Sequence, residues 1–150
     1  MFKLPKTRTT WYNRKVSNME VPDVKEYPAI WLQAAGCTGC SVSVLNAINP
    51  SIKNLLVDEV LPGHHVNLRF HPTVMAGAGA PAIEVMIDSS QQKKGAYILI
   101  VEGAIPTAKG GIHGVLGEKD GKAMTMQSWV ETLAKDALAV IALGSCAAFG

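Results

Sequence analysis

The hydrophobic positions of this chain form short runs of strand character that alternate with stretches of helical spacing. The predicted strands are 29–35, 66–71, 96–101 and 138–143. The predicted helices are 41–48, 80–90 and 125–137. Apolar strands that alternate with helices indicate βαβ units. The pattern therefore predicts an α/β domain with an open, mostly parallel sheet and helices on both of its faces.

The remaining segments divide the chain into an arm and one domain. Residues 1–28 are mostly polar and are interrupted by three prolines, so we expect an N-terminal arm there and a single domain over 29–150. Residues 53–60 fit either a second short helix or a loop. The glycine-rich stretch after Gly103 is typical of a surface hairpin or loop without regular structure.

Composition and charge exclude several classes of protein. The 150 residues are 48% hydrophobic and 17% charged, which is an ordinary globular mixture. The net charge is +2, and the basic residues are scattered apart from a short cluster between Lys3 and Lys15, so we expect no nucleic-acid partner. No apolar run reaches the ~18–20 residues of a transmembrane helix. The missing export signal favours the cytoplasm, whereas a removed signal would leave a periplasmic or membrane-associated protein open.

All three cysteines follow predicted strands. Cys37 and Cys40 form a C-x-x-C motif just after the first strand, and Cys146 follows the last one. Because the carboxyl ends of parallel strands share one edge of the sheet, we expect the three thiols to lie near one another.

Three kinds of thiol site are compatible with this pattern. A thiol–disulfide oxidoreductase uses a C-x-x-C on a strand-to-helix turn, but it has no use for a third cysteine. A zinc-stapled binding domain needs one more ligand, and this chain has enough apolar residues to hold its sheet without a zinc ion. An iron–sulfur cluster accepts C-x-x-C with two distant thiolates, and nearby glycine N–H groups can donate to its sulfurs. The iron–sulfur cluster is the favoured interpretation, and a four-iron cluster would then need a fourth ligand beyond residue 150.

Two further polar residues mark the same edge. Glu102 follows the third strand, and a structural carboxylate that accepts backbone N–H groups competes there with a role at an interface or in proton movement. His71 precedes a proline, so a hydrogen-bonded turn residue is favoured over a metal ligand. His64 and His65 are expected to lie in an exposed loop.

Four blocks of sequence carry a resemblance to a known family. They are 30–46 (IWLQAAGCTGCSVSVLN), 70–76 (FHPTVMA), 101–107 (VEGAIPT) and 144–150 (GSCAAFG). In this order they resemble the small subunit of nickel–iron hydrogenases, and the Ser-Val-Ser after Cys40 is closest to the nickel–iron–selenium branch. Many members have glutamates where this chain has Gly36 and Val42, so a proton-relay carboxylate is not expected at those two positions.

The resemblance implies a flavodoxin-like domain and an electron-transfer function. Cys37, Cys40 and Cys146 match three ligands of the family's proximal 4Fe–4S cluster, and the fourth would lie past residue 150, with a second domain and further clusters. The cluster would exchange electrons with a nickel–iron centre in a separate large subunit during reversible H2 oxidation. No catalytic residue is expected in this subunit. The electron acceptor or donor, a protein or a quinone-linked partner, is not identified by the sequence.

Overall fold

The structure is a computed structural model that describes residues 24–150. Its strands are β1 (Lys25–Gln33), β2 (His64–Phe70), β3 (Ile98–Glu102), β4 (Val115–Lys119), β5 (Lys122–Thr125) and β6 (Ala139–Leu143). Its α-helices are α2 (Gly39–Leu45), α3 (Ile52–Leu56), α4 (Ala80–Gln92), α5 (Met126–Ala134) and α6 (Ser145–Phe149), and a 3-10 turn η1 covers Ala108–Gly111. Within the described residues, no helix combines the length and the apolar character that a membrane crossing requires.

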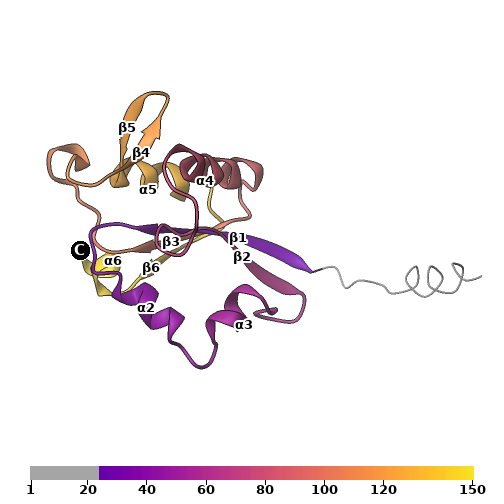
Figure 1. Ribbon diagram of the computed structural model, residues 1–150. Coiled ribbons are helices and arrows are strands. Elements are labelled where there is room, and N and C mark those ends of the chain that lie inside the picture. The colour runs from indigo at the N-terminus through magenta and orange to yellow at the C-terminus, as the bar shows by residue number, and fades with distance from the viewer. Residues whose placement is uncertain (1–23) are drawn as a thin grey trace, which may run out of the picture.

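Four strands form one parallel sheet in the order β2-β1-β3-β6. This order is the beginning of the flavodoxin-like order 2-1-3-4-5, in which the connections reverse direction between the first and third strands. Helices α2 and α3 lie on one face of the sheet, and α4, α5 and the β4–β5 hairpin lie on the other (Figure 1). The predicted parallel α/β fold with helices on both faces is confirmed.

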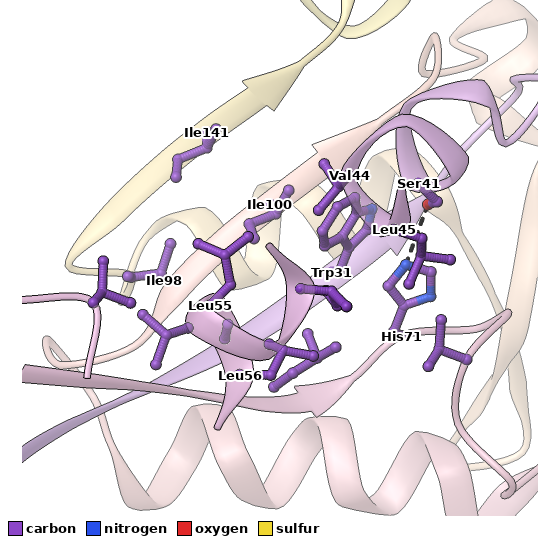
Figure 2. A pocket seen from close by; sticks show the side chains of 16 residues that line it. Trp31, Ser41, Val44, Leu45, Leu55, Leu56, His71, Ile98, Ile100 and Ile141 are labelled. Carbon is purple, nitrogen blue, oxygen red and sulfur yellow. Dashed lines mark hydrogen bonds between the residues drawn. The ribbon is translucent and has the colours of Figure 1, made fainter. Parts of the chain in front are cut away.

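The two faces of the sheet are packed to different degrees. On the α4–α5 face, alternate strand residues such as Leu32, Leu99 and Val101 join a closed core with Met86 and Trp129. On the α2–α3 face, the short helices leave an apolar cavity of about 240 Å³ against the sheet (Figure 2). The sheet residues that line this cavity are Ala29, Trp31, Val66, Leu68, Ile98, Ile100 and Ile141.

The sheet is longer at its amino end than the sequence predicts. Strand β1 begins at Lys25, so residues 25–28 of the predicted arm belong to the sheet, and residues 1–23 of that arm lie outside the described residues. Strand β2 begins at His64, and the expectation of exposed loop histidines is wrong. His64 stacks on Tyr27 with ring centroids 5.7 Å apart, and both His64 and His65 are half-buried.

The segments left open in the sequence resolve into short elements. Residues 52–56 form a helix, followed by a loop to β2. The glycine-rich stretch contains the predicted hairpin, although its two strands are regular, contrary to expectation. Asp120 and Gly121 connect the strands with positive φ angles of 53° and 72°, as a two-residue hairpin turn requires.

Candidate functional site

The loop after β1 is held against the loop after β3. The Ala34 N–H donates to the Glu102 carbonyl at 2.7 Å, and Ala35 and Ala104 exchange two backbone hydrogen bonds of 2.9 and 2.8 Å. Gly103 makes this approach possible, because a Cβ there would lie 2.8 Å from the Ala35 carbonyl oxygen. The backbone that leads into Cys37 is therefore fixed by the neighbouring strand.

The loop before Cys146 reaches the same place from β6, a strand at the edge of the sheet. Cys40 lies in the first turn of α2, and Cys146 lies in the first turn of α6 after Gly144, whose φ is +82°. A Cβ at Gly144 would lie only 2.3 Å from the Cys40 Sγ. The carboxyl ends of β1 and β6 thus bring their cysteine-bearing loops into contact, and the start of α2 and α6 occupy one end of the molecule (Figure 1).

The electrostatics of Cys40 reflect this gathering of thiols. Burial raises the pKa of Cys40, and the negative charges of Glu102, Cys37 and Cys146 raise it further. A redox-active C-x-x-C needs the opposite, a thiol whose pKa is lowered. A bound cation, in contrast, deprotonates a coordinating thiol outright and offsets the mutual repulsion. The raised pKa of Cys40 therefore argues against a catalytic dithiol.

The spacing of the donors bears on which metal group fits. Among residues 24–150, no three His, Cys, Asp or Glu side chains gather closely enough to hold a single metal ion. A zinc ion needs its sulfur ligands at about 2.3 Å from one point. Thiolates of an iron–sulfur cluster bind different irons and lie farther apart. The Gly144 backbone lies against the Cys40 Sγ, and Cys37 and Cys146 are further free thiols on the two loops that meet there, which fits a cluster better than a single zinc ion.

A buried polar network lies beneath the C-x-x-C loop. Glu102 at the end of β3 accepts hydrogen bonds from the Trp31 Nε1–H at 3.0 Å and the Gln33 side-chain amide at 3.2 Å. It also accepts the Ser41 backbone N–H at 3.1 Å and the Ser41 hydroxyl. Burial raises the pKa of Glu102, but these hydrogen bonds outweigh it and hold the pKa below its usual range. Of the two roles left open by the sequence, these hydrogen bonds fit the structural carboxylate.

His71 belongs to this network as a turn residue. Its Nδ1 accepts the Thr73 N–H at 3.2 Å, and its Nε2 lies 3.2 Å from the Ser41 Oγ (Figure 2). Burial lowers the pKa of His71, although the Glu102 charge opposes this shift. The hydrogen-bonded turn predicted for His71 agrees with this geometry.

Gln33 and Ser41, which connect the network, were not predicted from the sequence. Ser41 is almost completely buried and contacts both Glu102 and His71. Gln33 donates to the Ser41 Oγ at 2.9 Å and accepts a hydrogen bond from the Thr73 hydroxyl. The available signal was an amide in an otherwise apolar strand and a small polar residue directly after Cys40.

A family model described as "NADH ubiquinone oxidoreductase, 20 Kd subunit" matches residues 37–150, which include all three cysteines and both Glu102 and His71. The chain belongs to this family. Within it, the chain corresponds to the N-terminal domain of nickel–iron and nickel–iron–selenium hydrogenase small subunits, so the resemblance given by the four sequence blocks is confirmed.

Individual members of the family are similar over most of this chain. The periplasmic [NiFeSe] hydrogenase small subunit of Desulfomicrobium baculatum is 42% identical over 144 residues, covering 93% of this chain and 44% of the relative. The periplasmic [NiFe] hydrogenase small subunit 1 of Nitratidesulfovibrio vulgaris is 40% identical over 121 residues, covering 81% and 34%. The chain therefore spans less than half the length of these relatives.

Solved structures of the family share the fold. The recombinant [NiFeSe] hydrogenase from Desulfovibrio vulgaris Hildenborough matches with a TM-score of 0.76 and 39% identity, over 83% of this chain and 42% of that one. A reduced, active form of the enzyme from Desulfomicrobium baculatum matches with a TM-score of 0.70 and 44% identity, over 77% and 41%.

Proposed function

We propose that this chain is the proximal-cluster part of a hydrogenase small subunit, which conducts electrons to or from a nickel–iron centre in a large subunit during H2 oxidation. Cys37, Cys40 and Cys146 would each give one thiolate to a 4Fe–4S cluster, and the fourth ligand would come from outside this chain. When bound, such a cluster accepts and returns one electron at a time. The chain itself performs no hydrogen chemistry.

The observation that carries the proposal is the meeting of two cysteine-bearing loops from distant strands. The backbone of Gly144 packs against the Cys40 Sγ, and the charges of Cys37 and Cys146 both act on that thiol. Each loop is fixed by its own strand, so the three thiols can be held in position before a metal group is bound. Such pre-positioning limits the structural change that accompanies electron transfer.

The outer surface of α2 supports a large protein partner. Val42 is about half exposed, and Ile48, just after the helix, is 91% exposed. Contiguous apolar side chains beside a functional site are typical of an interface. A permanent heterodimer would cover them, with a larger and more apolar interface than transient complexes have. The large subunit is therefore the proposed partner at this surface.

The decisive experiment measures iron in the complete protein after anaerobic purification. Cys146→Ser should lower iron and acid-labile sulfide by about one four-iron cluster per chain, because a serine hydroxyl is a poor substitute for a thiolate. Ser145→Ala is the matched control, since it changes the neighbouring exposed residue of α6 and should leave the iron content unchanged.

The alternatives give different results in the same experiment. A colourless protein that contains zinc, or that contains only free thiols, would support the zinc-stapled domain or the thiol–disulfide oxidoreductase. Unchanged iron per chain in Cys146→Ser would remove Cys146 from the ligand set.

A further inference from the structure

Glu102 carries a buried negative charge, as its hydrogen bonds indicate. The side chain is only 3% exposed, and its Oε1 accepts the Ser41 N–H while its Oε2 accepts hydrogen bonds from Trp31, Gln33 and the Ser41 hydroxyl. The Gln33 amide is oriented by the Thr73 hydroxyl, which donates to the Gln33 Oε1. All four groups around the carboxyl are donors. A protonated carboxyl would lose one of these bonds, so the ionised form fits the site.

No cation neutralises this charge within residues 24–150. The ion pairs in that part of the chain are Lys53–Asp58 and Lys94–Asp136, and neither includes Glu102. The only titratable base in the network is His71, whose Nδ1 accepts the Thr73 N–H. His71 is therefore the neutral tautomer that donates from Nε2 to the Ser41 Oγ. Among residues 24–150, the carboxylate is stabilised by dipoles alone.

The charge lies directly beneath the C-x-x-C motif. The Ser41 N–H that binds the Glu102 Oε1 belongs to the peptide group that follows Cys40. The same hydrogen bond also occupies an N–H group that could otherwise donate to a sulfur of the site.

We propose that Glu102 is a fixed negative charge that lowers the reduction potential of the iron–sulfur cluster bound through Cys40. This inference rests on the proposed function. Adding an electron beside an uncompensated negative charge costs free energy, and net charge and hydrogen bonds to sulfur are established determinants of cluster potential. The carboxylate acts in both ways, because it adds a charge and withdraws the Ser41 N–H. Glu102 is thus a positioning and tuning residue that keeps the proximal cluster strongly reducing.

Redox titration of the complete hydrogenase, followed by electron paramagnetic resonance, tests the inference. Glu102→Gln keeps the shape of the side chain and removes its charge. We expect the equilibrium constant for reduction of the proximal cluster to rise about tenfold, which corresponds to about 59 mV for one electron. Glu102→Asp keeps the charge and should remain close to the wild type. Glu118→Gln is the matched control, because it removes an exposed carboxylate on β4.

The outcomes separate this inference from the proposed function. A normal iron content with an unchanged potential in Glu102→Gln would overturn the tuning role and leave the cluster assignment intact. A wild-type protein without iron would overturn the proposed function itself. Equal shifts of the reduction potential in the Asp and Gln variants would show that Glu102 has only a structural role, because the Asp variant retains the charge.

A measurement on the unaltered protein covers the case in which Glu102→Gln does not fold. The reduced-minus-oxidised infrared difference spectrum should show an ionised carboxylate band shifted by reduction, and no band of a protonated carboxyl group. A protonated carboxyl band that appears on reduction would mean that the charge is not fixed, and would overturn the inference.

Discussion

Gly103 is the residue at which the cysteine loop and the end of β3 come closest. Its φ is +86°, a region that side chains rarely adopt, and a Cβ would lie 2.8 Å from the carbonyl oxygen and 2.9 Å from the carbonyl carbon of Ala35. The first cysteine follows Ala35 by two residues. The absence of a side chain at Gly103 therefore determines how closely the cysteine loop can lie against the sheet.

We expect Gly103→Ala to destabilise the protein and disturb the site. The left-handed backbone costs roughly 1–2 kcal/mol for alanine, and the forced displacement of Ala35 adds about 1–3 kcal/mol. Gly121→Ala is the control, because Gly121 has a similar φ of +72° and open space around its Cβ position. Denaturant unfolding should show the larger loss in Gly103→Ala, accompanied by lower iron content. Equal losses in both variants would contradict the close approach.

At single positions, the sequence was informative where polarity contrasts with its surroundings. Glu102 and His71 were recognised because each lies at the end of a predicted strand. Ser41 was missed because serine at the start of a helix is usually a capping residue exposed to solvent. Its burial depends on three other segments that fold over it, and no local pattern records that.

At the scale of elements, His71 connects the end of β2 to α2 through Ser41. Burial lowers its pKa in the folded protein, whereas the unfolded chain binds a proton near pH 6.5. Below that pH the unfolded state therefore holds more protons than the folded state. Stability is fully present above about pH 6.5 and decreases as the pH falls toward the folded-state pKa.

This difference predicts an acid sensitivity that depends on His71. Between neutral pH and mildly acidic pH, His71→Gln should flatten the decline in the free energy of unfolding, by at most about 1.4 kcal/mol per pH unit. His113→Gln is the matched control, because His113 is exposed on the loop before β4. Unfolding at several pH values measures the slopes, and identical slopes for the wild type and His71→Gln would refute the prediction.

Most elements followed from periodicity, and the errors share a physical cause. The first residues of β1 pair only with β2, since the pairing with β3 begins at Ala29. A strand segment with one neighbour needs no apolar face, so Lys25–Tyr27 and His64–His65 were indistinguishable from loop. The β4–β5 hairpin carried a visible signal, the Asp120-Gly121 turn, but its strands are short and have no sustained alternation of apolar and polar residues.

At the scale of the whole molecule, β6 is the least covered strand. It is an edge of the sheet, and Val140 and Ile141, on opposite faces, are 50% and 43% exposed. An exposed apolar edge strand is a template for pairing with another chain. The described domain therefore has an exposed apolar edge strand next to Cys146, with which another chain can pair.

We expect the 150-residue chain, produced alone, to self-associate through β6. Val140→Lys should raise the concentration needed for association roughly tenfold, or about 1.4 kcal/mol, since a lysine on an edge strand opposes pairing. Val57→Lys serves as the control, because Val57 is 69% exposed but lies outside the sheet. Sedimentation velocity measures the effect. Equal changes in both variants would argue for nonspecific association.

The convergence of the thiols could be anticipated because parallel strands share their carboxyl edge, but the strand order could not. The structure places β3 between β1 and β6, so Glu102 lies between the two cysteine-bearing loops. That position makes a carboxylate part of the site. The four sequence blocks identified the family. Only the order of the strands places Glu102 between the two cysteine-bearing loops.

The same order has a consequence for biogenesis. Cys40 and the Gly144 backbone that contacts it are more than one hundred positions apart, and β6, which precedes that glycine, is synthesised after the other strands of the described sheet. Contacts of such high sequence separation form slowly. The two cysteine-bearing loops therefore meet only after these four strands have paired, so insertion of the proposed cluster must follow the folding of the described sheet.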